Sequence, residues 1–256
     1  MSEVNFDDAP SVVRVAVPPQ RVMRHLRPVL PIHASSAIRG EAYSVALPQP
    51  APPAGAYRAV GKRVLDVLLV ILASPLALLL VGVSALLLWI EGGAPFYRQA
   101  RLGKDGNRFA ILKLRTMVRD ADRLLETYLE SDPEMRAEWE TLQKLRNDPR
   151  ITPIGAFLRK TSLDELPQLW NVLRGEMSLV GPRPMMIEQL TMYGNPEHYF
   201  ALRPGITGYW QVSQRNDSAF SARTALDAAY NYNMSLVEDT KVLLRTVGAV
   251  IRRTGC

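Results

Sequence analysis

The pattern of apolar and polar positions is dominated by one segment, residues 64–90, with the sequence VLDVLLVILASPLALLLVGVSALLLWI. It carries a single charge, Asp66, near its start, and its length suits a membrane-spanning helix. Ser74 and Pro75 stand near its middle, where proline removes a backbone donor and crowds the preceding turn. The helix should therefore kink or break there, which leaves two alternatives: a straight spanning helix or a helix-break-helix hairpin.

Basic residues flank this segment on both sides. They are Arg58, Lys62 and Arg63 before it, and Arg98, Arg101, Lys104 and Arg108 after it. Because lysine and arginine remain on the cytoplasmic side of a membrane, neither flank should cross. We therefore expect residues 57–91 to form a re-entrant hairpin that dips into the membrane and returns, with Ser74 and Pro75 at its break.

The N-terminal region, residues 1–56, holds nine of the 19 prolines and shows neither an alternating nor a helical apolar period. This composition is typical of a disordered tail. No apolar core of suitable length follows its basic residues, so the pattern does not resemble a secretory signal. We therefore expect a disordered, proline-rich tail over residues 1–56.

After residue 91 the composition becomes that of a compact cytosolic domain of the α/β (α+β) class, which we place at residues 92–256. Strand-like segments on either side of the turn GKDG, residues 103–106, predict a β-hairpin. Residues 118–146 predict heavily charged helices with a break near Asp132 and Pro133. The sequence thus predicts a small mixed domain that follows the membrane segment.

The C-terminal segment, residues 236–255, places apolar side chains among basic ones. This pattern suits an amphipathic helix that lies along an anionic membrane surface. It suits equally well a helix that packs against the domain. Both alternatives remain open at this point.

Composition limits the classes of function. The formal net charge of +6 indicates an anionic partner, such as nucleic acid, acidic lipid or a phosphorylated substrate. Aromatic residues are not interleaved with the basic ones, which disfavours nucleic acid. The single cysteine, Cys256, excludes a disulfide framework, and the three histidines are too scattered for a local zinc site.

The stretch KTSLDELPQLWN, residues 160–171, places Asp164 beside Glu165. One interpretation is structural: Ser162 caps a helix, and Glu165 reaches back to it from three residues on. Pro167 prefers the first helical position, so the helix begins either there or at a loose turn before it. In both cases Asp164 stands at a helix N-terminus, where free amide donors favour an anion.

Basic side chains lie close to this pair in the sequence. The turn GPRP, residues 181–184, presents Arg183, and the stretch 203–217 supplies Arg203 and Arg215 on another rigid turn. Each turn alone is compatible with an ordinary surface corner. Beside an acid pair and a membrane segment, several arginines suit a diphosphate substrate.

Five sequence blocks, in the same order, resemble those of the bacterial sugar transferase family, the monotopic polyprenyl-phosphate hexose-1-phosphate transferases. The blocks are KRVLDVLLVILASPLALLL, PFYRQARLGKDGNRFAILKLRTM, DPRITPIGAFLRKTSLDELPQLWNVLRGEMSLVGPRP, RPGITGYWQVSQRND and LDAAYNYNMSL. The likeness covers residues 57–256 and is strongest to small exopolysaccharide-type members. One departure is Gln214, where a small residue is expected, and it leaves the local turn open.

The resemblance implies a catalytic domain whose nucleophile is Asp164 and whose dyad partner is Glu165, with Mg²⁺ held by this pair. Asp164 would attack the sugar-bearing phosphate of a nucleotide-diphospho-sugar. We expect Asp164 to be ionised, because neighbouring arginines and the helix N-terminus favour the charged form. The residues expected to bind the substrate or its phosphates are Lys113, Arg159, Arg183, Arg203, Arg215 and Asp227.

The expected donor is UDP-galactose or UDP-glucose, with UMP as the product, and the expected acceptor is undecaprenyl phosphate. The resemblance implies a monotopic protein of the bacterial inner membrane, with its catalytic domain on the cytoplasmic face. The alternative function is a basic, membrane-bound scaffold of polysaccharide assembly without enzymatic activity, for which Asp164 would not matter. A glycosidase is disfavoured, because adjacent carboxylates seldom flank a glycosidic bond. The oligomeric state stays open, a homo-oligomer included.

Overall fold

The computed structural model of the protein describes residues 55–142, 145–213 and 222–251. The expected tail lies outside this part of the chain except for its last two residues, and so do Gln214 and Arg215. The α-helices are α1 (Lys62–Gly92), α2 (Ala121–Ser131), α3 (Pro133–Leu142), α4 (Pro153–Thr161), α5 (Gln168–Arg174), α6 (Leu190–Tyr193), α7 (Glu197–Phe200), α8 (Tyr209–Val212), α9 (Ala222–Asn233) and α10 (Leu236–Ile251). The strands are β1 (Phe96–Leu102), β2 (Arg108–Leu114), β3 (Ser178–Val180) and β4 (Gly205–Thr207), and the short π- and 3₁₀-helices are η1 (Tyr57–Gly61), η2 (Lys104–Gly106), η3 (Leu163–Glu165) and η4 (Ile187–Gln189).

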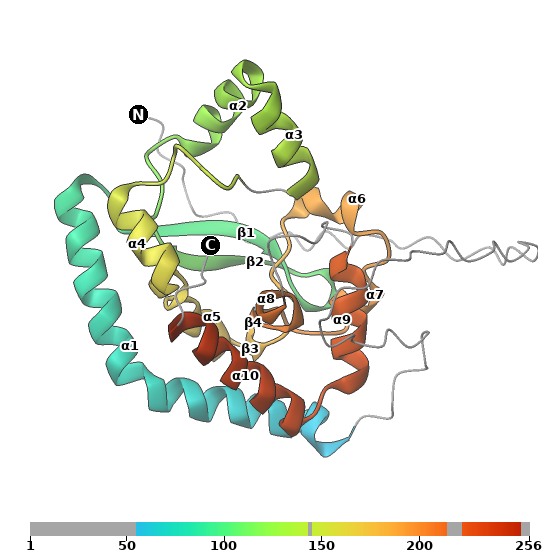
Figure 1. The fold of residues 1–256 in the computed structure, drawn as a ribbon. Helices are drawn as coiled ribbons and strands as arrows, with labels where there is room; N and C mark the ends of the chain where they lie inside the picture. The colour runs from blue at the N-terminus through green and yellow to red at the C-terminus, as the bar shows by residue number, and fades with distance from the viewer. Residues whose placement is uncertain (1–54, 143–144, 214–221, 252–256) are drawn as a thin grey trace, which may run out of the picture. The chain divides into compact units, whose positions relative to one another are not determined.

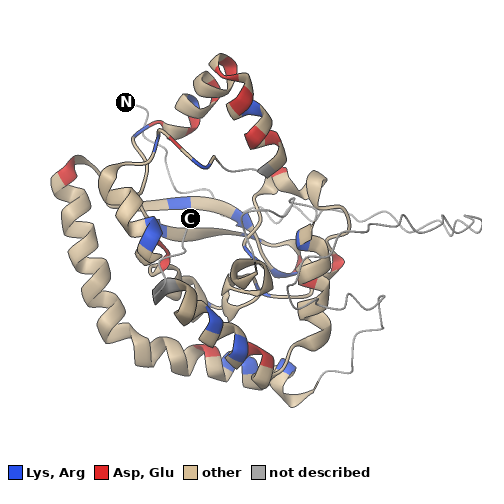
Figure 2. Ribbon diagram, viewed as in Figure 1, with Lys and Arg blue, Asp and Glu red and all other residues tan. Residues whose placement is uncertain are grey.

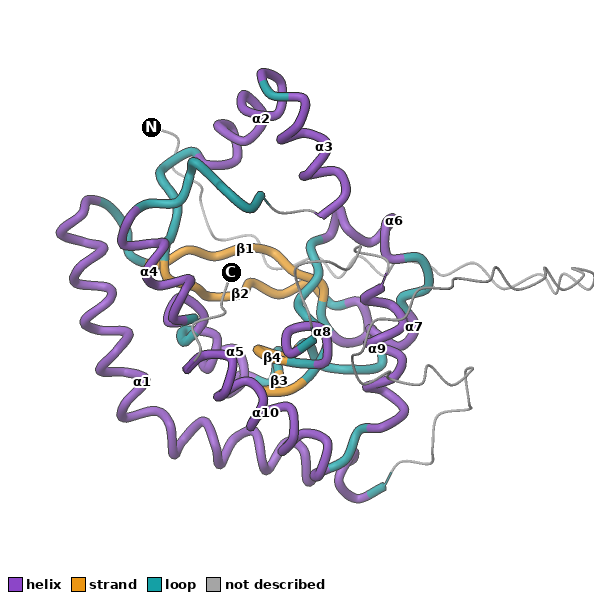
Figure 3. Tube along the Cα trace, viewed as in Figure 1, coloured by secondary structure: helices purple, strands orange, loops and turns teal. Residues whose placement is uncertain are grey.

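The strands form two small sheets set among helices (Figure 3). β1 and β2 pair in an antiparallel register that places Tyr97 opposite Lys113, and the turn between them holds Asp105 at φ 58°. β3 and β4 pair in parallel, with Val180 opposite Thr207. The predicted β-hairpin around the turn GKDG is confirmed, and so is the prediction of a mixed domain of helices and strands.

The apolar segment forms α1, one continuous helix with Pro75 inside it. Ser74 Oγ donates to the carbonyl of Ile71 at 2.8 Å, and Figure 1 shows the helix bending near its middle. A bend is expected, because proline cannot donate the intrahelical hydrogen bond that its position requires. The sequence therefore predicted the distortion, which takes the form of a bend within one helix.

The first turns of α1 are fixed to the domain by charged side chains. Lys62 Nζ lies 2.6 Å from Asp239 Oδ2 in α10. Further along, Asp66 Oδ1 accepts a hydrogen bond of 3.0 Å from the amide of Leu179 in β3. Val70 is buried in an apolar cluster with side chains of β2 and α5. The N-terminal third of the helix is thus anchored by polar and apolar contacts together.

The last turns of α1 contact the same domain. Arg115 follows β2 and donates to the carbonyls of Gly92, at 2.7 Å, and Leu88, at 3.1 Å. Its guanidinium also lies 3.6 Å from Glu91. A cation at a helix C-terminus is favourable, because the last carbonyls lack partners within the helix. Leu88 is buried beside Leu158 of α4, so both ends of this apolar helix dock on one domain.

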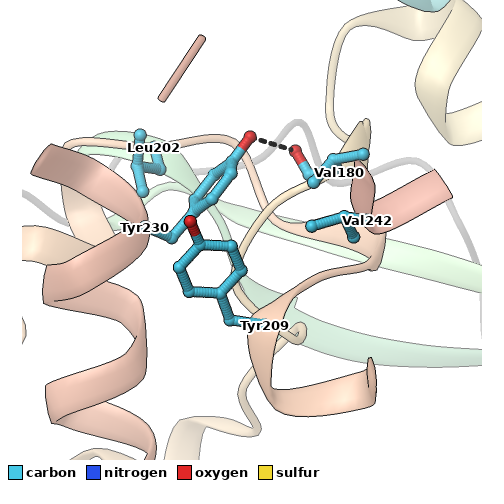
Figure 4. Packing of buried hydrophobic residues seen from close by; sticks show 5 residues of the cluster. All are labelled: Val180, Leu202, Tyr209, Tyr230 and Val242. Carbon is cyan, nitrogen blue, oxygen red and sulfur yellow. Dashed lines mark hydrogen bonds between the residues drawn. The ribbon is translucent and has the colours of Figure 1, made fainter. Parts of the chain in front are cut away.

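Tyrosines form a substantial part of the core. Tyr209 and Tyr230 pack edge to face, with ring centroids 5.3 Å apart. Figure 4 shows them among Val180, Leu202 and Val242. The buried Tyr230 hydroxyl donates to the Val180 carbonyl at 3.2 Å, so its polar atom is satisfied. This cluster joins β3 to α8, α9 and α10.

The predicted charged helices with a break are α2 and α3. Asp132 ends α2, and its Oδ1 accepts hydrogen bonds from the amides of Glu134, at 2.9 Å, and Met135, at 3.0 Å. An aspartate in this position satisfies amides that the first turn of a helix leaves free. The break near Asp132 is therefore confirmed, and its cause is the capping of α3.

Of the two alternatives left open for the C-terminal segment, packing against the domain is confirmed for α10, and a location along a membrane surface stays a prediction. Val242 is buried in the core, whereas Leu236, Val237, Leu244 and Val247 are exposed. One face of α10 therefore packs against the domain while apolar side chains on the remainder of its surface stay uncovered.

Candidate active site

The acidic pair lies in a short connection between α4 and α5. Ser162 ends α4 in the left-handed conformation, at φ 57°, and its side chain makes no capping hydrogen bond. Asp164 and Glu165 follow in the 3₁₀ turn η3, and Pro167 is the N-cap of α5. The predicted capping box is therefore wrong: Glu165 Oε1 instead accepts a hydrogen bond of 2.8 Å from Lys113 Nζ.

Asp164 is buried, with 7% of its surface exposed. Its Oδ2 lies 3.8 Å from Lys113 Nζ, which places one cation between the two acids. Burial raises the pKa of Asp164, Lys113 and Arg159 lower it, and Glu165 adds to the rise. The cations favour the charged form as expected, but removal from water outweighs them.

Arg159 is held by a close contact between α4 and the end of the hairpin. Its Nε donates to Thr116 Oγ1 at 2.9 Å. Gly155 packs directly on the backbone of Thr116, where any Cβ would overlap the Thr116 carbonyl. Burial lowers the pKa of Arg159, and the charge of Asp164 partly offsets this effect. The absence of a side chain at position 155 thus sets where Arg159 stands relative to the acid pair.

The GPRP turn is locked to the chain around β4 by two glycines. Gly181 donates to the Thr207 carbonyl, and Gly205 donates to the Pro182 carbonyl, each at 2.8 Å. Neither glycine leaves room for a Cβ against the other segment. This close approach directs Arg183 towards the acids, and its NH1 lies 3.9 Å from Glu165 Oε1.

These side chains border a small cavity that is partly open to solvent. Lys113, Glu165 and Arg183 line it, together with Gly205 and Ile206 of β4. Asp164 lies beside it, next to Lys113. The cationic side chains of its lining suit an anionic group such as a phosphate.

Two other predicted binding residues lie elsewhere. Arg203 is exposed, and its Nε donates to the Gly175 carbonyl, at 2.9 Å, at the C-terminal end of α5. Asp227 is buried in α9, where it accepts a hydrogen bond from the Tyr193 hydroxyl. Neither lines the cavity. Arg215 lies outside the described residues.

The acid pair is the candidate site for Mg²⁺. Within the described ranges no group of three or more histidine, cysteine, aspartate or glutamate side chains is arranged to hold a metal. Mg²⁺ does not require such a group, because it is commonly bound by one or two carboxylates together with phosphate oxygens and water. Asp164 and Glu165 beside a cavity lined by cations fit this pattern.

In the sequence, Arg101 stands out only as one of the basic residues that flank the membrane segment. In the structure it lines the cavity near the end of β1. The next residue, Leu102, donates to the Met185 carbonyl at 2.9 Å and so holds this strand end beside the GPRP turn. The sequence did contain a signal for this role, since Arg101 and Lys113 belong to one β-hairpin. That both side chains line the same cavity, however, depends on the contact between β1 and the chain after the GPRP turn, which the sequence does not show.

Comparison with known proteins connects this site to a family. A family model described as Bacterial sugar transferase matches residues 57–253. The chain is 44% identical over 228 residues to the exopolysaccharide production protein ExoY of Sinorhizobium fredii, which spans 86% of this chain and 98% of that protein. It is 54% identical over 166 residues to the UDP-galactose-lipid carrier transferase of Erwinia amylovora, and the aligned region covers 64% of this chain and 35% of that protein.

A third relative is more distant. The UDP-glucose:undecaprenyl-phosphate glucose-1-phosphate transferase of Caulobacter vibrioides is 39% identical over 200 residues. That alignment covers 74% of this chain and 69% of the relative. The chain therefore matches nearly the whole of some relatives and a part of others.

Proposed function

Because the chain belongs to the bacterial sugar transferase family, we propose that it transfers a hexose-1-phosphate from a UDP-sugar to undecaprenyl phosphate in exopolysaccharide synthesis. The observation that carries this proposal is the buried carboxylate of Asp164 beside a cavity lined by the cations Lys113 and Arg183. The likeness to the UDP-glucose:undecaprenyl-phosphate glucose-1-phosphate transferase of Caulobacter vibrioides supports the same reaction class.

The reaction proceeds in two displacements at one phosphorus atom. An Asp164 oxygen bonds to the sugar-bearing phosphorus of the donor, the P–O–P bridge breaks, and UMP leaves with the bridging oxygen. An oxygen of the lipid phosphate then attacks the same phosphorus and releases the Asp164 carboxylate. The product is a lipid diphosphate sugar in which the C1–O bond of the sugar was never broken.

Cationic side chains make the first displacement feasible, because nucleophile and substrate are both anionic. Lys113 contacts both acids, at 3.8 Å to Asp164 and 2.8 Å to Glu165. Arg183 approaches from the GPRP turn. Fixed positive charges that face developing negative charge act without reorganisation at the moment of reaction, which is where most of their catalytic effect arises. The burial that raises the pKa of Asp164 also leaves its anion poorly hydrated and therefore more reactive.

Mg²⁺ is proposed as the cofactor. Asp164 and Glu165 would hold it together with donor phosphate oxygens, and it would supply further neutralisation of phosphate charge. Lys113 stands between the same two carboxylates, so its ammonium group has to share them with the ion or move aside. Glu165 then has two roles, as a metal ligand and as a partner that keeps Lys113 in place.

The proposed donors are UDP-galactose and UDP-glucose. The relatives from Erwinia amylovora and Caulobacter vibrioides are named after UDP-galactose and UDP-glucose, respectively, which supports these two donors. A panel of UDP-sugars incubated with membranes and undecaprenyl phosphate, scored for UMP release, identifies the hexose. Release of UDP in place of UMP would indicate sugar transfer without phosphate and contradict the proposed chemistry.

The proposed location is the cytoplasmic face of the inner membrane, with α1 re-entrant. The segment Tyr57–Gly92 is long and apolar enough to cross a membrane, and Figure 2 shows α1 free of charge over nearly all of its length. A straight helix of this length would place its ends on opposite sides. Its two ends instead dock on the same domain, through Lys62 and through Arg115, which supports a bent helix that enters and leaves by one leaflet.

Apolar side chains on the domain extend this proposed membrane surface. Exposed residues of α4 and α5 include Phe157 and Trp170, and α10 contributes Leu244 and Val247. Helices with such faces lie in the headgroup region, where the phosphate of a polyprenol is located. This arrangement would hold the cavity at the depth at which a lipid phosphate meets a water-soluble donor.

Topology is tested with single cysteines at the exposed positions 55 and 94, in a Cys256→Ser background. Intact spheroplasts should leave both unlabelled by a membrane-impermeant maleimide, and inverted vesicles should label both. If either one is labelled in spheroplasts, α1 crosses the membrane and the re-entrant arrangement is wrong. The chemical proposal would stand in that case.

The chemical proposal is tested by trapping the intermediate. Protein incubated with a donor labelled in the sugar phosphate, without lipid acceptor, should release UMP and retain label on the peptide that contains Asp164, as found by mass spectrometry. Addition of undecaprenyl phosphate should then move the label to lipid. Transfer to lipid without an adduct, with kinetics of a ternary complex, would overturn the aspartyl-phosphosugar intermediate.

A further inference from the structure

Arg101 is a cation of the cavity to which the proposed reaction has so far given no role. It lies in β1, and it lines the cavity together with Lys113 and Arg183. The main chain at Arg101 is held in place, because the hydrogen bond from the Leu102 amide to the Met185 carbonyl joins the end of β1 to the chain that follows the GPRP turn. Arg101 therefore extends from a strand and not from a loop.

The described partners of Arg101 are neutral. Its guanidinium donates to the side-chain oxygen of Gln99 and, at 3.3 Å, to the carbonyl of Pro184. Among the described residues no carboxylate lies within ion-pair distance of it, and its buried Nε has no hydrogen-bond partner. A largely buried guanidinium without an acid is costly unless an anion compensates it.

Two further arginines stand close to Arg101. Arg223, with 4% of its surface exposed, donates to the carbonyl of Arg183 at 2.7 Å. Burial, together with the charges of Arg183 and Arg223, lowers the pKa of Arg101 to about 10. The side chain is therefore still charged at neutral pH, in a place where like charges disfavour it. Such a cluster of arginines is the arrangement that a phosphate would stabilise.

The cations of the cavity differ in their contacts with the acids. Lys113 Nζ lies 3.8 Å from Asp164 Oδ2, and Arg183 NH1 lies 3.9 Å from Glu165 Oε1, whereas Arg101 lines the same cavity with no described carboxylate within ion-pair distance. The charge of Arg183 also acts on Arg101, so the two guanidinium groups are neighbours. A diphosphate with its reacting phosphorus at Asp164 would therefore leave Arg101 available to its second phosphate.

We propose that Arg101 binds the second phosphate of the donor, the one that leaves as part of the nucleoside monophosphate. This inference rests on the proposed function. When Asp164 bonds to the sugar-bearing phosphorus, the electron pair of the broken bond goes to the bridging oxygen, which stays on the departing UMP. A guanidinium with two parallel N–H donors matches the dianion that forms there, and it would hold the leaving group through the bond-breaking step.

The test uses equilibrium binding of UMP and of uridine to the full chain in detergent, followed by ligand-observed NMR, and needs no turnover. Arg101→Gln should weaken UMP about ten- to a hundredfold, as expected for loss of a charge-assisted hydrogen bond, and leave uridine unchanged. Arg101→Lys should have an intermediate affinity for UMP, because lysine keeps the positive charge but lacks the two parallel N–H donors of a guanidinium. The matched control is Arg98→Gln, an exposed arginine of the same strand, which should change UMP binding less than about threefold.

The outcomes separate this inference from the proposed function. If wild-type protein binds no UMP, the proposed function and the role of Arg101 fail together. If wild type binds UMP and Arg101→Gln binds it equally well, or loses UMP and uridine in the same proportion, only the role of Arg101 is overturned. If Arg101→Gln does not yield folded protein, Arg101→Met and Arg101→Lys are judged by the same ratio of uridine to UMP dissociation constants.

A second measurement separates the two phosphates that enter the cavity in turn. In steady-state assays Arg101→Gln should raise the KM for the UDP-sugar and the inhibition constant of UMP, with the KM for undecaprenyl phosphate unchanged. A rise confined to the lipid substrate would assign Arg101 to the acceptor phosphate and overturn the proposal.

Discussion

Asp164 and Asp227 are both buried acids, with 7% and 3% of their surface exposed, and in both burial raises the pKa. Their surroundings differ. Asp164 stands beside a cavity, 3.8 Å from an ammonium group that lines it. Asp227 accepts a hydrogen bond from the Tyr193 hydroxyl inside the packed region around α9, with the charge of Arg223 nearby.

The difference shows how the cost of burying a carboxylate is offset in a site and in a core. Around Asp227 the compensating groups are permanent parts of the fold, so the acid is satisfied and closed off. Around Asp164 the compensation comes from cations that also face an open space, which another anion can share. A buried acid indicates catalysis only in the second arrangement, although both acids show a pKa shift in the same direction.

The largest expected effect separates the two acids by activity. Asp164→Asn should lower donor-dependent UMP release by at least about a thousandfold, because it removes the atom that bonds to phosphorus. Asp227→Asn should lower UMP release by less than about tenfold, because the Asp227 side chain contacts Tyr193 and does not line the cavity. Both are measured with a UDP-sugar and undecaprenyl phosphate in detergent.

Folding provides the control for this pair. Asp164→Asn replaces a buried acid by a neutral side chain of the same shape. Because burial raises the pKa of Asp164, its ionised form lowers stability, so the variant should unfold in detergent at a temperature no lower than that of wild type. If Asp164→Asn keeps more than about a tenth of the wild-type rate, Asp164 is not the nucleophile. A wild type that releases no UMP would instead favour the non-enzymatic scaffold.

The next effect in size concerns the cation between the acids. Lys113→Met should lower UMP release about a hundredfold, since one preorganised positive charge at a phosphoryl-transfer site has effects of this order. Lys104→Met, at the exposed turn of the same hairpin, is the matched control and should stay within about twofold of wild type. Equal rates in the two variants would show that Lys113 only balances Glu165.

The ionisation of Asp227 should make the free energy of unfolding depend on pH. Burial raises the pKa of Asp227 from 3.8 to about 6, in spite of the Tyr193 hydrogen bond. At about 1.4 kcal/mol per pH unit, ionised Asp227 costs the folded protein about 3 kcal/mol relative to the unfolded chain. We therefore expect wild type to lose up to about 3 kcal/mol relative to Asp227→Asn as the pH rises from 4 to 7.

The sign follows from proton binding. Between pH 3.8 and about 6 the folded state retains a proton that the unfolded chain has lost, so rising pH favours unfolding. Above pH 6 the penalty is complete and the difference between the two proteins becomes constant. Chemical unfolding in detergent at several pH values measures it. Parallel stability curves for wild type and Asp227→Asn would mean that Asp227 does not titrate in this range.

Sequence patterns predicted much of the fold because the relevant signals are local. The turn GKDG, the break at Asp132 and the distortion at Pro75 each depend on the conformations available to a few neighbouring residues. The capping box at Ser162 failed for the same reason. Its local pattern was satisfied, but tertiary contacts place Ser162 in the left-handed conformation and turn Glu165 towards Lys113, 52 residues earlier in the chain.

The cavity was predictable only in part. Arg183 was noted on its turn in the sequence, and the resemblance assigned phosphate-binding roles to Lys113, Arg159 and Arg183. No local pattern could have brought their side chains to the acid pair. The contacts that do so are backbone approaches that require glycine, such as Gly155 against Thr116 and Gly181 against the chain around β4. Such approaches are invisible in one sequence, because a glycine at a close contact and a glycine in a simple turn have the same letter.

The smallest expected effect tests whether the boundary of the cavity is drawn correctly. Arg203 was predicted to bind phosphate, but its exposed side chain contacts the Gly175 carbonyl beyond α5. Arg203→Gln should therefore cost only about 0.3–1 kcal/mol of stability, the usual size of a cation at a helix C-terminus. The rate of UMP release should fall less than about threefold in Arg203→Gln. It should fall far more in Arg183→Gln, because Arg183 lines the cavity. A loss beyond about tenfold in Arg203→Gln would show that Arg203 swings into the site during turnover, and that the arginines cannot be divided by their positions in this structure.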